Sequence, residues 1–90
     1  MEFEWDSQKA KSNLAKHDIS FEEAKTVFED PLYVDFYDPD HSEAEHRYIL
    51  IGESSRNRIL LVSYTERGYQ IRLISARQVT KQEIKADQEG

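Results

Sequence analysis

The segment SYTERGYQIRLISARQ, residues 63–78, predicts two β-strands joined by a tight turn at Arg67 and Gly68. Both halves are rich in residues that favour strands, and the glycine permits the backbone to reverse. Strands that follow one another through short turns pair antiparallel. The hairpin therefore predicts a sheet-forming domain, and it carries three arginines that packing does not explain, Arg67, Arg72 and Arg77.

Further strands are expected on the N-terminal side of this hairpin. The first hairpin strand begins with a continuous apolar run at Ile59, which is typical of a strand in the middle of a sheet. A short edge strand is expected at the N-terminus, where Trp5 would anchor the core. Together the expected strands are residues 3–6, 32–38, 47–52, 59–66 and 69–77.

Helix-capping signals place two helices between the first two strands. Asp6 or Ser7 is a suitable N-cap for a helix that continues to about His17. Ser20, with Glu23 three residues later, has the capping-box pattern that begins a second helix.

A third helix is expected at the C-terminus, where Thr80 and Glu83 repeat the capping-box pattern. The chain is thus expected to form an α+β domain. Its antiparallel sheet would have four to five strands, with two N-terminal helices and one C-terminal helix.

Length and composition exclude several classes of protein. Ninety residues make a single domain, residues 1–90, with one modest core. The chain has no cysteine, so neither disulfides nor thiolate metal sites are expected. It has no apolar run of about 18 residues and no signal-peptide pattern, which favours a cytoplasmic protein that does not meet a membrane.

The charge is distributed unevenly along the chain. The net charge is −6, but residues 1–46 hold 4 Lys, no Arg and 13 Asp or Glu, giving 4 − 13 = −9. Residues 47–90 hold 8 Lys or Arg and 5 acids, giving 8 − 5 = +3. A local anion site is therefore compatible with an acidic protein.

Two interpretations of the hairpin arginines stay open. In one, a cluster of guanidinium groups binds phosphate in bidentate fashion. In the other, the arginines form cross-strand ion pairs that contribute little energy. Strict alternation places Arg77 on the face of Leu73 and Arg72 on the opposite face. Arg72 and Arg77 are then not expected in one site, and one of them can pair with an acid such as Glu66.

The histidines give weaker signals. His17 stands at the end of a predicted helix, where the helix dipole stabilises a cation. His41 and His46 flank an acidic loop, but their spacing matches no metal-ligand pattern, so no metal site is expected.

Several short motifs occur in a recognisable order. They are FEWD at residues 3–6, KH at 16–17, SFEEAKTVFEDP at 20–31, HRYILIG at 46–52, LLVSYTERG at 60–68 and IRLISARQVTKQE at 71–83. In this order and spacing they resemble the BrnT family, ribonuclease toxins of bacterial type II toxin-antitoxin systems. The resemblance covers about residues 2–85. Where the family commonly has glycine after the KH pair, this chain has Asp18, which also tolerates a left-handed helix C-cap.

The resemblance implies a RelE-like fold and endoribonuclease activity that needs no metal or other cofactor and inhibits translation and growth. RNA carries its own nucleophile, the 2′-hydroxyl, so fixed arginines can stabilise the charge of the reacting phosphate. The implied catalytic residues are Arg67 and Arg77, supported by Arg72 and Arg47, with Glu45 as the general base. The implied RNA-binding residues are Lys9, Lys16 and His17.

The resemblance also implies a protein partner. A BrnA-like antitoxin would neutralise the toxin in a hetero-oligomer, and the toxin would meet DNA only through that antitoxin. The competing interpretation is a non-catalytic binding module whose arginine-rich face docks an acidic partner.

Overall fold

The hairpin predicted from residues 63–78 is confirmed in the computed structural model, which describes residues 1–41 and 45–79. Strands β4 (Ile59–Arg67) and β5 (Gln70–Gln78) pair antiparallel on either side of Gly68. The φ of Gly68 is 60°, a left-handed conformation that glycine adopts without steric cost. Because the turn depends on the conformational preference of a single glycine, the hairpin could be predicted from the sequence.

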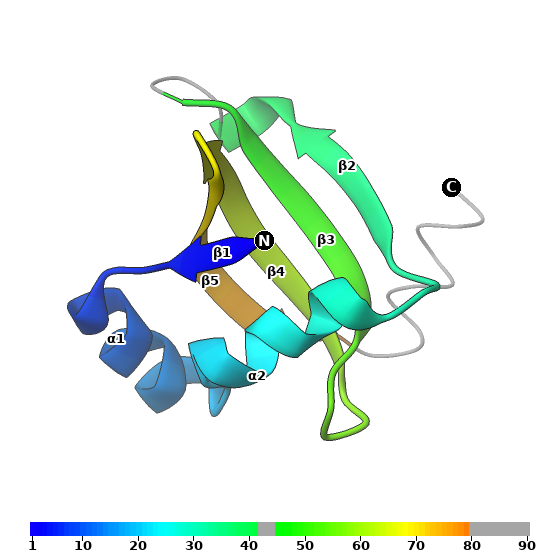
Figure 1. The fold of residues 1–90 in the computed structure, drawn as a ribbon. Helices are drawn as coiled ribbons and strands as arrows, with labels where there is room; N and C mark the ends of the chain where they lie inside the picture. Colours follow the sequence, from blue (N-terminus) through cyan, green and yellow to red (C-terminus); the bar gives the residue numbers. More distant parts are fainter. Residues whose placement is uncertain (42–44, 80–90) are drawn as a thin grey trace.

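The hairpin belongs to a five-stranded sheet with the order β1-β5-β4-β3-β2 (Figure 1). Strands β3 (Arg47–Glu53) and β2 (Val34–Asp38) continue the antiparallel meander, and β4 is central, as expected. Strand β1 (Glu2–Glu4) is an edge strand as predicted, but it runs parallel to β5. The expectation of an all-antiparallel sheet is therefore wrong, because no short turn joins β1 to its partner strand.

Two helices connect β1 to the meander. Helix α1 (Ser7–His17) begins at Asp6, whose carboxylate accepts hydrogen bonds from the backbone N–H groups of Gln8 and Lys9. It ends at Asp18, which has the expected left-handed conformation with φ 59°.

Helix α2 (Phe21–Thr26) begins at Ser20, whose hydroxyl accepts the Glu23 N–H at 3.1 Å. Short 3₁₀ turns follow at Val27–Glu29, η1, and at Pro39–His41, η2. The predicted C-terminal helix, from residue 80 on, lies outside the described residues.

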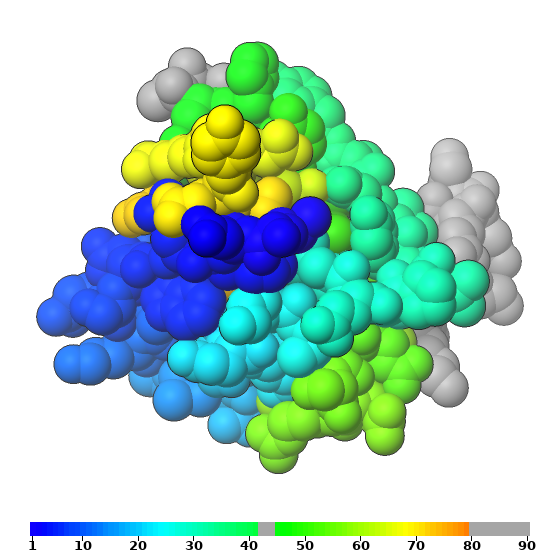
Figure 2. Space-filling model, in the orientation of Figure 1, coloured from blue at the N-terminus to red at the C-terminus, as the bar shows by residue number. Residues whose placement is uncertain are grey.

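The core lies between one face of the sheet and the helical segment formed by α2 and η1. Figure 2 shows the cyan segment of α2 beside the blue N-terminal segment on the surface of the molecule. Trp5 packs against the core at its edge, with its ring centroid 5.8 Å from that of Phe21. The buried residues of this core cluster are Ile19, Phe21, Ala24, Val27, Leu50, Leu60, Val62, Tyr64, Ile71, Leu73 and Ala76.

A β-bulge at Ile74 changes which side chains share a face of β5. Tyr64 of β4 is opposite Leu73, whereas the preceding residue of β4 is opposite Ser75, so Ile74 is the extra residue. Arg72 and Arg77 consequently point to the same face. The expectation that they lie on opposite faces is wrong, because it assumed an uninterrupted alternation.

Candidate functional site

The sheet face opposite the core carries all four arginines that we expected to be functional. Thr65 of β4 is opposite Arg47 on one side and Arg72 on the other, so these three residues share a face. Arg67 follows Thr65 by two positions on β4, and Arg77 is brought to the same face by the bulge. We call this surface the open face, because neither described helix covers it.

Two of these arginines line a hollow of about 380 Å³ on the open face. Arg47 enters it from β3 and Arg77 from β5, and both side chains are partly buried. Its floor combines small hydroxyl groups with aliphatic side chains. The lining residues are Asp38, His41, Arg47, Ile49, Leu61, Ser63, Ile74, Ser75 and Arg77.

A histidine–carboxylate pair stands at one side of this hollow. The Nδ1 atom of His41 lies 2.9 Å from Oδ2 of Asp38. The His41 side chain is 67% exposed and the Asp38 side chain only 13%, so the carboxylate lies deeper and the ring faces solvent. We assigned no role to His41 from sequence. A usable signal was the i, i+3 spacing across Pro39, since a 3₁₀ turn aligns such side chains.

The other two arginines hold carboxylates beside the hollow. Arg67 Nη2 lies 3.3 Å from Glu45 Oε2, and Arg72 Nη1 lies 3.6 Å from Glu4 Oε2. The partner of Arg72 is therefore on β1 and not Glu66. Neither Arg67, Arg72 nor Glu45 lines the hollow.

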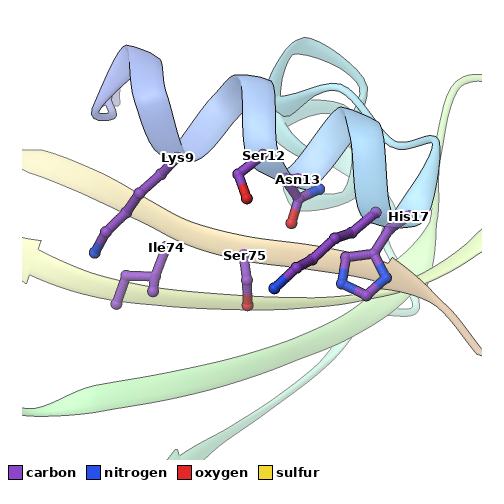
Figure 3. A pocket seen from close by; sticks show the side chains of 7 residues that line it. Lys9, Ser12, Asn13, His17, Ile74 and Ser75 are labelled. Atoms are coloured by element: carbon purple, nitrogen blue, oxygen red, sulfur yellow. The ribbon is translucent and has the colours of Figure 1, made fainter.

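A second hollow, of about 230 Å³, lies between α1 and β5 and contains the three predicted RNA-binding residues. In Figure 3, Lys9 and His17 stand towards its two ends, with Ser12 and Asn13 between them. The full lining is Lys9, Ser12, Asn13, Lys16, His17, Ile74 and Ser75. Ile74 and Ser75 line both hollows, so the bulge of β5 is their common boundary.

Asn13 attaches α1 to the edge of β5, a structural role that we did not assign to it from sequence. Its side-chain amide donates to the carbonyl oxygens of Ile19 at 2.9 Å and Ala76 at 2.8 Å. Its Oδ1 accepts the Ala76 N–H at 2.9 Å. The Asn13 side chain thus makes the two backbone hydrogen bonds to Ala76 that a neighbouring strand would otherwise make.

Arg58 has a structural role away from both hollows. Its guanidinium binds the buried carboxylate of Glu23, and the Ser54 hydroxyl donates to the same carboxylate at 2.6 Å. The Arg58 hydrogen bond holds the pKa of Glu23 below its usual value, and Ser54 acts in the same direction. Glu23 therefore ties α2 to the β3–β4 turn instead of closing the capping box with its side chain.

Two kinds of site are not found in the part of the chain that the structure describes. Residues 1–41 and 45–79 contain no group of three or more His, Cys, Asp or Glu side chains that could hold a metal ion. Among the same residues, no helix is long and apolar enough to span a membrane.

Comparison with known proteins identifies the family of this chain. Residues 5–83 match the sequence model of a family described as the ribonuclease toxin BrnT of type II toxin-antitoxin systems. The chain belongs to the BrnT family. This confirms the resemblance, and membership implies an antitoxin partner.

A solved BrnT structure supports the assignment. The crystal structure of the Brucella abortus ribonuclease toxin BrnT is 25% identical to this chain, with a TM-score of 0.66. The alignment covers 90% of this chain and 99% of that one. No curated protein matches the chain.

Proposed function

We propose that this BrnT-family protein is a metal-independent endoribonuclease that binds the scissile phosphate between Arg47 and Arg77. One observation carries the proposal: Arg47, Arg77 and the His41–Asp38 pair line a single hollow on the open face. Guanidinium groups match the geometry of phosphate oxygens and remain charged at every physiological pH.

The proposed reaction is an internal transesterification. The 2′-hydroxyl oxygen attacks the adjacent phosphorus, the bond from phosphorus to the 5′-oxygen breaks, and a 2′,3′-cyclic phosphate forms. One proton leaves the 2′-hydroxyl and one is added to the departing 5′-oxygen. Arg47 and Arg77 stabilise the negative charge that develops on the phosphate oxygens in the transition state.

His41 is the side chain that we propose for proton transfer. Imidazole accepts and donates protons near neutral pH, and the Asp38 carboxylate orients the ring through Nδ1, which leaves Nε2 for the substrate. Glu45, the base expected from sequence, stays a candidate. Its carboxylate contacts Arg67 and does not line the hollow, whereas His41 does.

Arg67 and Arg72 are proposed as supporting residues at the edge of the site. Neither lines the hollow, and each contacts a carboxylate outside it. We expect them to orient the RNA backbone more than to stabilise the transition state.

The toxin is proposed to act in the cytoplasm, to inhibit translation and growth, and to be neutralised by a BrnA-like antitoxin in a hetero-oligomer. It would meet DNA only through that antitoxin. Leu32, Val34 and Phe36, at or near the edge strand β2, are 83%, 55% and 44% exposed, which supports a protein-binding surface there. Likeness to RelE-type toxins stays a prediction. Induced expression should arrest growth, and co-expressed antitoxin should relieve the arrest.

A non-catalytic binding module is the second candidate. The carboxylates held by Arg67 and Arg72 show that the open face accommodates acidic groups. Such a module would bind an acidic partner without cleaving RNA.

The deciding experiment is cleavage of a labelled RNA by the purified protein in EDTA. Wild type should cleave, and Arg77→Ala and Arg47→Ala should each be slower by about a hundredfold, or about 2.7 kcal/mol of transition-state stabilisation. Arg56→Ala, which removes an exposed arginine from the β3–β4 turn, is the matched control and should cleave normally. Circular dichroism checks folding. Intact RNA with wild type, or equal cleavage by every variant, would favour the binding module.

A further inference from the structure

The face that α1 presents to β5 is polar where a packed helix is usually apolar. Lys9, Ser12, Asn13, Lys16 and His17 follow the i, i+3, i+4, i+7, i+8 spacing of one helix face, and all five line the hollow beside β5. Among the residues of α1, only Asn13 is buried. This face of α1 is therefore suited to contact a polar ligand instead of the protein core.

The hollow is basic in a protein whose net charge is −6. It has two lysines and a histidine, and no acidic residue is among those that line it. The acids at the two ends of α1 have other partners. Asp6 accepts two backbone N–H groups, and the Asp18 carboxylate lies 3.7 Å from the Arg58 guanidinium. The positive charge of the hollow is thus available to an anion.

The walls of the hollow are fixed relative to each other. The three hydrogen bonds of the buried Asn13 side chain join α1 to Ala76 of β5 and to the carbonyl of Ile19. A site whose walls are already in place loses less conformational entropy on binding. Asn13 is therefore a positioning residue for both the α1 side chains and the strand that carries Arg77.

The hollow also adjoins the proposed catalytic site. Ser75 and Ile74 belong to the linings of both hollows, and Ser75 shares the face of Arg77. A polymer held at Arg77 can pass over the bulge into the space beside α1. Lys9 and Lys16 are seven residues apart, about 10.5 Å along the helix axis, which is long enough to follow a nucleic-acid backbone.

We infer that the hollow between α1 and β5 is a second phosphate site, which binds the backbone of nucleotides adjacent to the scissile phosphate. This inference rests on the proposed ribonuclease function. Lysines act as mobile point charges, so the contacts should be independent of base sequence. RNA longer than a dinucleotide should therefore be the better substrate.

Substrate length tests this inference directly. For wild type, kcat/KM should be at least about tenfold higher for a hexanucleotide than for a dinucleotide that contains the same cleaved bond, because the longer RNA adds phosphate contacts. In the double variant Lys9→Ala, Lys16→Ala this ratio should fall towards one. Lys11→Ala, on the same helix but outside the hollow, is the matched control and should keep the wild-type ratio.

A non-cleavable ligand separates failure of this inference from failure of the proposed function. Binding of a fluorescent 2′-deoxy hexanucleotide can be followed by anisotropy even if no RNA is cleaved. The double variant should bind more weakly than wild type, and its slope of log K against log salt should be smaller by about 1.4, because two phosphate contacts are lost at about 0.7 each.

Three outcomes would overturn the inference. One is an equal kcat/KM for both substrate lengths in wild type. Another is a double variant that binds the oligonucleotide as wild type does, with the same salt dependence. A third is a double variant with unchanged oligonucleotide binding but weaker binding of the antitoxin, which would make the hollow a protein site.

Discussion

The Nδ1 atom of His41 lies 2.9 Å from Oδ2 of Asp38, at the side of the hollow that also contains Arg47 and Arg77. Strand β2 ends at Asp38, and the 3₁₀ turn that follows carries His41 back over the end of the same strand. The turn thus adds an imidazole ring to a hollow whose other polar residues come from strands.

Replacing His41 should slow RNA cleavage without unfolding the protein. We expect His41→Ala to lower kcat by about 10²–10⁴-fold, the usual contribution of a positioned acid or base. His46→Ala removes a nearby histidine that does not line the hollow and should have little effect. A large loss in Glu45→Gln with normal kcat in His41→Ala would assign the base to Glu45 instead.

Replacing Asn13 should weaken the attachment of α1 to β5. Asn13→Ala leaves the backbone N–H and C=O of Ala76 without the side-chain partner, and each such buried group costs about 1–3 kcal/mol. Urea unfolding should show a loss of at least about 2 kcal/mol. Faster hydrogen exchange at the Ala76 amide would locate the effect. Gln8→Ala, an exposed change on the same helix, should leave both measurements near wild type.

The buried Glu23–Arg58 pair should make stability depend on pH. Its hydrogen bonds lower the pKa of Glu23 in the folded state, so the folded protein binds this proton less readily than the unfolded chain. The stabilisation is therefore complete above the ordinary glutamate pKa of 4.5 and is lost as pH falls through the lower folded pKa.

Glu23→Gln tests this dependence. At pH 7 the variant should lose about 3 kcal/mol of unfolding free energy, because Arg58 keeps its charge but loses its buried carboxylate partner. The difference between wild type and variant should shrink as the pH is lowered below 4.5, as measured by urea unfolding. Glu22→Gln, an exposed neighbour, is the control. A constant difference at all pH values would contradict the linkage.

Gly52 has little room for a side chain. A Cβ atom there would lie 3.0 Å from Asp30 Oδ2 and 3.0 Å from Val27 Cγ1. The Asp30 carboxylate is held in place because it accepts the Glu53 N–H. Gly52→Ala should destabilise the fold by about 1–3 kcal/mol in urea unfolding, as overpacking usually does.

Gly68 provides the comparison, because it has open space but a positive φ. Gly68→Asn should therefore stay near wild-type stability, since asparagine tolerates the left-handed conformation. Similar losses at both positions would show that space at Gly52 is not the cause.

The elements that follow from local chemistry were predictable from the sequence. The N-caps at Asp6 and Ser20, the left-handed Asp18 and the turn at Gly68 each depend on neighbouring residues, and each is observed. The motif order was enough to indicate the family, because the motifs span most of the chain.

Only the tertiary structure decided which of these residues meet. The bulge at Ile74 reverses the face of every following residue of β5, and neighbouring residues alone do not reveal it. Strand β1 pairs in parallel with β5, although the two strands are far apart in the sequence. His41 lines the same hollow as Arg47 and Arg77 because the turn η2 places it there. Caps and turns are set by contacts a few residues apart, whereas register and shared faces depend on packing between distant segments.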